Sequence, residues 1–164
     1  MSQCELNHAT EGVGKTSIIH TIVTDTFPKD VKKQFQTVTI SPDLYLLPNN
    51  NATVLVDSSA SKTVEQQTDS EIEKAHVIIL VYDVNNFDII KRLKAYWLPR
   101  IAKINDKVPV ILCGNKMDLR STTAEGDLES ILTPNLFTQF KQVEMGIECS
   151  AKGYIGLIDI IACA

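Results

Sequence analysis

The feature that most constrains the fold of this chain is the run Gly12-Val13-Gly14-Lys15-Thr16-Ser17, which leads directly into an apolar helical pattern. A glycine-rich turn followed by lysine, threonine and a helix is typical of loops that bind phosphate groups. Glycine lets the backbone curl so that successive N–H groups face phosphate oxygens. The following helix adds the positive end of its dipole. We therefore predict a phosphate-binding loop formed by Gly12, Val13, Gly14, Lys15, Thr16 and Ser17.

Two residues of this loop have further predicted roles. Lys15 is expected to reach the outer phosphates of a nucleotide and is the predicted catalytic residue, and the Thr16 hydroxyl is expected to ligate Mg²⁺. The motif is incomplete, because Ala9 stands where a glycine is typical. The alternative is a glycine-rich turn that only begins an amphipathic helix.

The composition favours one globular, intracellular domain. The 164 residues are 44% hydrophobic and carry a formal charge of −4, so no basic footprint for nucleic acid or for a membrane surface is evident. No apolar run approaches the roughly 20 residues that span a membrane, and the polar N-terminus does not resemble a secretory signal. The four cysteines show no C-x-x-C spacing. Cys113 and Cys149 lie in or beside apolar runs, so we expect buried, reduced thiols and no metal site there.

Strand and helix patterns alternate along the chain, which predicts an α/β fold with a mostly parallel sheet. The apolar runs 77–82 and 108–113 predict strands buried on both faces, and residues 143–149 predict a last strand. Residues 37–40 and 52–56 predict a hairpin. Helices are expected at residues 14–24, 70–75, 88–104, 127–140 and 154–164, with interruptions near Pro99 and Pro134.

Further candidate site residues follow three predicted strands. Asp57 ends the strand at 52–56, where an acidic residue beside the Gly-Lys-Thr turn would hold magnesium, usually through water. Capping of the next turn is an equally good reading of Asp57. Asn115-Lys116-Met117-Asp118 follows the strand at 108–113. A carboxylate there can accept hydrogen bonds from the N1–H and 2-amino groups of guanine, whereas adenine would leave it unpaired at a cost of several kcal/mol. Ser150-Ala151-Lys152 follows the last strand and can place a backbone N–H on the guanine carbonyl.

These four motifs together resemble a Ras-superfamily small GTPase. The segments Tyr96-Trp97-Leu98-Pro99, Ile131-Leu132-Thr133-Pro134 and Ile147-Glu148-Cys149-Ser150-Ala151-Lys152 resemble one branch, the N-terminal GTPase domain of the mitochondrial Rho GTPases (Miro). The absence of the helix that typical Rho proteins insert after Asn-Lys-x-Asp also fits that branch. The resemblance covers about residues 9–160.

The resemblance implies a P-loop NTPase with the small G-protein fold, as a single domain over residues 1–164. It implies a switch that binds GTP and GDP with Mg²⁺, hydrolyses GTP and contacts effector or regulator proteins. The implied Mg²⁺ ligands are Thr16 and Asp57, and the implied guanine-binding residues are Asn115, Lys116, Asp118, Ser150, Ala151 and Lys152. In the Miro family this domain precedes EF-hands, a second GTPase domain and an outer mitochondrial membrane anchor, which this sequence does not include. We therefore expect the cytosolic face of that membrane for a full-length protein, and the cytoplasm for the chain as it stands.

The chain departs from the family pattern in both switch segments. Asp57-Ser58-Ser59-Ala60-Ser61 replaces Asp-x-x-Gly-Gln, so the glutamine that orients the attacking water is absent. The Ala60 N–H can still meet the γ-phosphate, but Ser61 is too short for the task of glutamine. In the first switch, the position of the magnesium-binding threonine falls on Gln34, and Thr37 or Thr39 are the possible substitutes. Glu11 must point away from the phosphates to avoid repelling them.

These departures keep several functions open. We expect a slow GTPase, and the alternatives are a guanine-nucleotide-binding adaptor with little or no hydrolysis and a non-functional fragment. A generic phosphate-loop ATPase or kinase is disfavoured by Asn-Lys-x-Asp.

The N-terminal residues 1–8 are unusually polar for the central strand of such a fold, since only Cys4 and Leu6 are suitably apolar. A polar strand at this place forgoes the burial of about three or four apolar side chains, each of which would contribute ~1.5–3 kcal/mol. The total stability of such a domain is only ~5–15 kcal/mol. We therefore expect a degraded first strand and a truncated last helix, in a truncated product of a Miro-type gene that is poorly stable alone. A cooperative melting transition well above roughly 50 °C would contradict this expectation.

Overall fold

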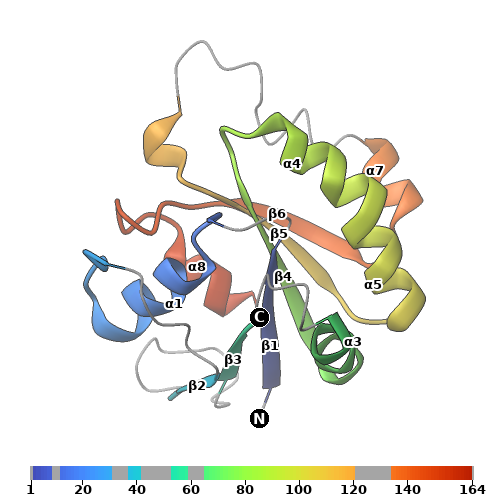
Figure 1. Cartoon of the computed structure of the whole chain (residues 1–164), viewed down its shortest axis with the longest axis horizontal. Helices are drawn as coiled ribbons and strands as arrows, with labels where there is room; N and C mark the ends of the chain where they lie inside the picture. Colours follow the sequence, from blue (N-terminus) through green and yellow to red (C-terminus); the bar gives the residue numbers. More distant parts are fainter. Residues whose placement is uncertain are drawn as a thin grey trace.

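A six-stranded sheet in the order β2-β3-β1-β4-β5-β6 forms the centre of the structure (Figure 1). The computed structural model describes residues 2–8, 12–30, 37–41, 53–58, 65–120 and 134–163. The strands are β1 (Ser2–His8), β2 (Thr37–Ile40), β3 (Thr53–Asp57), β4 (Val77–Asp83), β5 (Val110–Asn115) and β6 (Val143–Glu148). Strands β2 and β3 pair antiparallel, and the other four pairings are parallel. The predicted α/β fold, its mostly parallel sheet and its hairpin are confirmed.

The core strands form where the sequence is apolar without interruption. Residues 78–82 of β4 and 110–113 of β5 are each at most 2% exposed. Their registers run from Ile78 opposite Val110 to Asp83 opposite Asn115. Because helices cover both faces of this part of the sheet, the strands carry apolar side chains at every position.

Strand β1, which the sequence predicts weakly, nevertheless forms at the centre of the sheet. Its backbone pairs with β3 from Ser2 to Leu6 and with β4 from Cys4 to His8. Pairing on both sides satisfies backbone N–H and C=O groups of three strands at once, because a gap here would leave β3 and β4 with unpaired edges. A central strand is therefore present despite the polar sequence.

The helices divide between the two faces of the sheet. Figure 1 shows α1 (Lys15–Thr24) and α8 (Leu157–Ala162) on one face. The other face carries α3 (Glu65–Lys74), α4 (Phe87–Arg92), η2 (Leu93–Trp97), α5 (Leu98–Ile104) and α7 (Pro134–Gln139). A short 3₁₀ turn, η3 (Met117–Leu119), follows β5. None of the helices in the described part of the chain is long and apolar enough to cross a membrane.

Several predicted helix boundaries are wrong. Helix α3 begins at Glu65, five residues before its predicted start, and α8 begins at Leu157, where Gly156 has a left-handed φ of 69°. The interruption expected near Pro99 lies ahead of that proline, as the π-helical segment η2. Pro99 itself sits in the first turn of α5, where its missing N–H is not needed. Residues 127–133 of the predicted helix lie outside the described residues.

The predicted burial of Cys113 and Cys149 is confirmed. Cys113 and Cys149 are fully buried, with their Sγ atoms 3.4 Å apart. The hydrogen bond between the Cys113 and Cys149 thiols, together with burial, raises the pKa of the Cys113 thiol well above its ordinary value. Cys113 therefore stays protonated at neutral pH. Trp97 is buried in the core.

Candidate nucleotide-binding site

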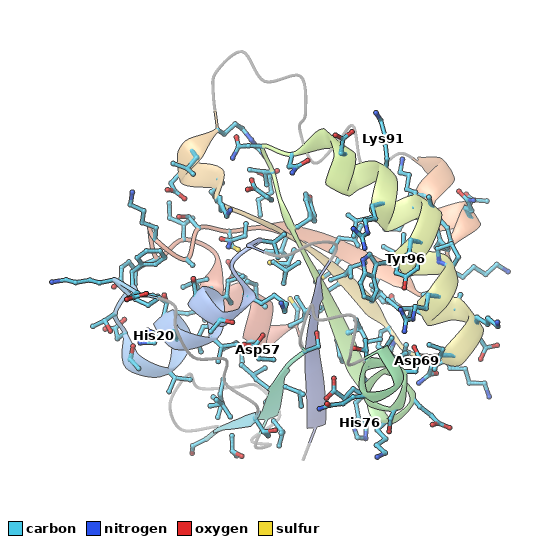
Figure 2. The ribbon with its side chains drawn as sticks, in the orientation of Figure 1. His20, Asp57, Asp69, His76, Lys91 and Tyr96 are labelled. Carbon is cyan, nitrogen blue, oxygen red and sulfur yellow. The ribbon has the colours of Figure 1, made fainter. Side chains whose placement is uncertain are left out.

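The predicted site residues gather at the edge of the sheet where the parallel strands end. Lys15 begins α1 directly after the loop that follows β1, and Asp57 ends β3. Asn115 ends β5, and Ser150 comes two residues after β6. Figure 2 shows Asp57 in the middle of the molecule, between β3 and α1. Ligands of open α/β sheets bind at this edge.

The turn before α1 depends on glycine. Gly12 and Gly14 have φ angles of 77° and 96°, in the left-handed region that L side chains rarely adopt. Gly14 also caps α1, since its carbonyl accepts the first helical hydrogen bond from the Ile18 N–H at 2.9 Å. The N-terminal N–H groups of α1 have no partners within the helix, which makes this end suited to an anion.

Asp57 faces the first two residues of α1. The Thr16 hydroxyl donates a hydrogen bond of 2.7 Å to Asp57 Oδ2, and Lys15 Nζ lies 3.9 Å from Asp57 Oδ1. The Asp57 and Lys15 side chains are almost fully buried. A hydroxyl and a carboxylate oxygen held together are hard oxygen donors of the kind that Mg²⁺ prefers, so the donor set fits this ion.

Asn115 joins three of the predicted motifs. Its Nδ2 donates to the Val13 carbonyl at 2.9 Å, and its Oδ1 accepts a hydrogen bond of 3.1 Å from the Ala151 N–H. The Cys149 thiol also lies 3.5 Å from Oδ1. Since Asn115 is only 2% exposed, these bonds are shielded from water. Asn115 therefore fixes the phosphate loop, the end of β5 and the Ser-Ala-Lys loop relative to one another.

Asp118 is held by the Ser-Ala-Lys loop. The Ser150 hydroxyl donates a hydrogen bond of 2.6 Å to Asp118 Oδ1 and accepts one of 2.8 Å from the Gly153 N–H. These bonds fix the rotation of the Asp118 carboxylate. Arg120 pairs with Glu148 through both guanidinium nitrogens, one contact being 2.9 Å, and so ties the end of η3 to β6.

A pocket of about 100 Å³ lies among these motifs. It is smaller than the roughly 300–1,000 Å³ of most small-molecule sites, so it suits one part of a ligand. Its lining consists of Gly14, Ser17, Phe27, Asn115, Lys116, Asp118, Leu119, Ala151 and Lys152. Seven of these nine residues belong to the predicted phosphate-binding and guanine-binding sets.

Phe27 and Leu119 line the pocket but were not predicted from the sequence. Phe27 lies in the irregular segment after α1, with its side chain 38% exposed. The available signal was an aromatic residue in a polar stretch without periodicity, followed by Pro28. A flat apolar ring at a pocket wall suits stacking against a planar base.

Lys116 is held by Asp83, another residue that no sequence motif indicated. Lys116 Nζ lies 2.8 Å from Asp83 Oδ2, and Asn85 bridges Asp83 Oδ1 and the Lys116 carbonyl. Lys116 itself has a left-handed φ of 67°. Burial raises the pKa of Asp83, but hydrogen bonds from Lys116 and Asn85 outweigh it, so the pKa lies below its ordinary value.

Asp83→Asn is expected to lower the free energy of unfolding by about 0.5–1.5 kcal/mol at neutral pH, a range discounted for partial exposure. A lowered folded-state pKa stabilises the protein above the ordinary carboxyl pKa of about 4, and this stability is lost as the pH falls through the folded-state value. The difference in the free energy of unfolding between wild type and Asp83→Asn should therefore shrink below about pH 4. Urea unfolding across this range measures it, and Asp106→Asn, in the exposed turn between α5 and β5, is a control that should leave the free energy of unfolding nearly unchanged. If this difference in the free energy of unfolding did not change with pH, Lys116 and Asn85 would not be stabilising the charged form of Asp83.

The residues of both predicted switch segments lie largely outside the described part of the chain. This holds for Gln34, Ser59, Ala60 and Ser61, and Ala9 and Glu11 of the phosphate-loop region also lie outside the described residues. Thr37 and Thr39, the possible first-switch ligands, lie on β2 with exposed side chains. Thr37 pairs with Val56 and Thr39 with Val54, so Thr37 is nearer to Asp57 along β3.

The parallel sheet, the glycine turn before α1 and the polar groups at the strand ends define a phosphate-loop nucleotide-binding domain. The family model of the Ras family matches residues 9–162. The chain therefore belongs to the Ras family.

Three relatives refine this placement. The chain is 32% identical over 150 residues to "Mitochondrial Rho GTPase 2" of Arabidopsis thaliana, covering 92% of this chain and 23% of the relative. It is 40% identical over 143 residues to "Mitochondrial Rho GTPase 1" of Cryptococcus neoformans, covering 86% and 20%. For "Mitochondrial Rho GTPase 1" of Mycosarcoma maydis, the identity is 36% over 141 residues, covering 85% and 18%. The chain spans about a fifth of the length of the curated relatives it matches.

Proposed function

We propose that residues 1–164 form one domain that binds GTP and GDP with Mg²⁺ and hydrolyses GTP slowly, as a molecular switch. The observation that supports this proposal most directly is the pair of hydrogen bonds made by the Asn115 side chain. This side chain links the phosphate loop to the Ser-Ala-Lys loop beside a pocket that Asp118 also lines. One site therefore combines residues suited to phosphate groups with residues suited to guanine.

The phosphate end of the site uses charge and backbone donors. In the proposal, Lys15 neutralises the outer phosphates and acts as the catalytic residue, while the amides of Gly12, Val13, Gly14, Thr16 and Ser17 bind phosphate oxygens. Thr16 and Asp57 would hold Mg²⁺, which when bound offsets negative charge on the phosphates. Lys15 stands beside Asp57, so both charges are already desolvated and oriented before a ligand arrives.

The guanine end of the site uses shape and hydrogen bonding. Asp118, oriented by Ser150, accepts hydrogen bonds from the two donors on the guanine edge. Phe27 and the Lys116 stem flank the base, and backbone donors of the loop containing Ala151 and Lys152 meet its carbonyl. Adenine lacks the donor pair that Asp118 needs, so the site should reject ATP.

Slow hydrolysis is proposed because Ser61 stands where glutamine would orient water. We expect single-turnover phosphate release at or below about 5 × 10⁻⁴ s⁻¹, the intrinsic rate of a Ras domain that has the glutamine. Ser61→Gln is expected to raise the rate, and Lys15→Met to abolish it. Release no faster than from Lys15→Met would instead favour the alternative, a guanine-nucleotide-dependent adaptor. A chain that retains no nucleotide would favour a non-functional fragment.

Binding of effector or regulator proteins is proposed only from the similarity to the relatives, and the same holds for the location in the cell. Because these are mitochondrial Rho GTPases by name, we propose that a longer protein containing this domain works at the outer mitochondrial membrane, facing the cytosol. For the chain as it stands, the cytoplasm is the corresponding proposal.

A further inference from the structure

Tyr154 has a backbone conformation that is uncommon for a bulky residue. It lies in the turn after Ser150-Ala151-Lys152 with a φ of 59°, and its side chain is 47% exposed. The turn is closed by hydrogen bonds between the backbones of Ser150 and Ile155, at 3.0 and 3.1 Å. A non-glycine residue in the left-handed region costs free energy, and such residues concentrate at ligand-binding and switch regions.

The Tyr154 hydroxyl reaches a segment that is far away in the sequence. It accepts a hydrogen bond of 2.7 Å from the backbone N–H of Phe27, 127 residues earlier. Tyr154 also lines a pocket of about 100 Å³ together with Thr21, Ile22 and Asp25 at the end of α1. Its ring therefore lies beside the point where α1 ends and the segment containing Phe27 begins.

Phe27 lies in a segment without regular structure. Helix α1 ends at Thr24, and the C-cap residue Asp25 has a left-handed φ of 52° that turns the chain away from the helix axis. The segment that follows carries the Phe27 ring to the wall of the pocket that also contains Asp118 and Lys116. A hydrogen bond to the Phe27 backbone restricts where that ring can lie.

The same short loop thus reaches two walls of the pocket. At its start, Ser150 orients the Asp118 carboxylate, and near its end Tyr154 holds Phe27. A purine between these walls would meet an oriented carboxylate at its edge and a restrained aromatic ring against its face.

We propose that Tyr154 is a positioning residue that latches Phe27 at the base-binding pocket and thereby slows nucleotide release, an inference that rests on the proposed function. The latch is assigned to the Tyr154 hydroxyl, because this is the atom that accepts the hydrogen bond from the Phe27 N–H. Tyr154→Phe removes this one atom from a half-exposed position and leaves the rest of the loop in place.

The test is the dissociation rate of a fluorescent GDP from the Mg²⁺-loaded protein, chased with excess unlabelled GDP. Loss of one hydrogen bond that positions Phe27 should speed release about three- to tenfold in Tyr154→Phe. The matched control is Tyr96→Phe, because Tyr96 is also partly exposed and its hydroxyl accepts a hydrogen bond from Arg100. Tyr96 lies across the sheet from α1, so this control should leave the rate unchanged (Figure 2).

A double-mutant cycle separates latching from a general structural role. In a Phe27→Ala background there is no ring to position, so adding Tyr154→Phe should not speed release further. Tyr154→Asn provides a second variant, since asparagine accepts the left-handed backbone more readily but lacks the hydroxyl at that reach. It should also release GDP faster than wild type.

Each outcome decides the proposal. Faster release that disappears in the Phe27→Ala background supports the latch. Equal rates for wild type and Tyr154→Phe, or effects of the two substitutions that simply multiply, overturn the latch and leave the proposed function intact. A wild-type chain that binds no guanine nucleotide overturns the proposed function and the latch together.

Discussion

Asp118→Asn is expected to weaken GDP binding by about 100- to 1,000-fold and to create affinity for xanthosine diphosphate. The Ser150 hydroxyl can keep its hydrogen bond to Oδ1 of the new amide, so the amide nitrogen takes the place of Oδ2. That nitrogen is a donor and would face the 2-amino group of guanine, which is also a donor. The charge-assisted hydrogen bond to the 2-amino group is lost and the bond to N1–H loses its charge, together about 3–4 kcal/mol. Xanthine carries an oxygen at that position, which the amide can satisfy.

Competition of GDP and xanthosine diphosphate against a fluorescent nucleotide measures both effects in one experiment. Asp106→Asn is a suitable control, because Asp106 is an exposed carboxylate in the turn between α5 and β5, at the opposite edge of the sheet. It should leave both affinities unchanged. An Asp118→Asn protein that retains wild-type GDP affinity would show that Asp118 does not contact the base.

Gly14→Ala is expected to lower the free energy of unfolding by about 3–5 kcal/mol, a large share of the ~5–15 kcal/mol of an ordinary domain. An added Cβ would lie 2.4 Å from Asn115 Nδ2, and the φ of 96° strains any L side chain. Asn115 is buried and bonded to both Val13 and Ala151, so it cannot move aside without leaving a buried polar group unsatisfied. The hydrogen bonds by which Asn115 connects the phosphate loop to the Ser-Ala-Lys loop would break, and nucleotide binding should be lost as well.

Gly12→Ala separates the collision from the backbone strain. Its φ of 77° is similar, but apart from its chain neighbours no atom of the described residues lies within 4 Å of an added Cβ. This control should therefore cost only about 1–2 kcal/mol. Urea unfolding of both variants in the absence of nucleotide measures the contrast. Equal losses would mean that the close approach of Gly14 to Asn115 has no energetic consequence.

The parts of the fold that could be predicted from the sequence are those that depend on local pattern. The continuous apolar runs of β4 and β5 predict strands within one or two residues of their observed ends, and the Gly-Lys-Thr turn predicts the start of α1. Strand β1 was hard to predict, because its formation depends on pairing with two strands far along the chain and only weakly on its own side chains.

The predictable part of the site consists of short motifs at strand ends. Asn115 and Asp118 are recognisable because their spacing is fixed by one turn of the chain. The sequence does not reveal the roles of Asp83, Phe27 and Tyr154, because each of these residues acts through a contact that forms only in the folded structure. Asp83 meets Lys116 across two neighbouring strand ends, and Tyr154 meets Phe27 over 127 residues of sequence.

One pocket at this edge of the sheet is expected to select guanine nucleotides. The most direct measurement is a titration of the purified chain with fluorescent GDP and Mg²⁺, followed by separate chases with excess GTP and excess ATP. We expect tight binding that GTP reverses and ATP does not. Absence of binding, or displacement by ATP as readily as by GTP, would contradict it.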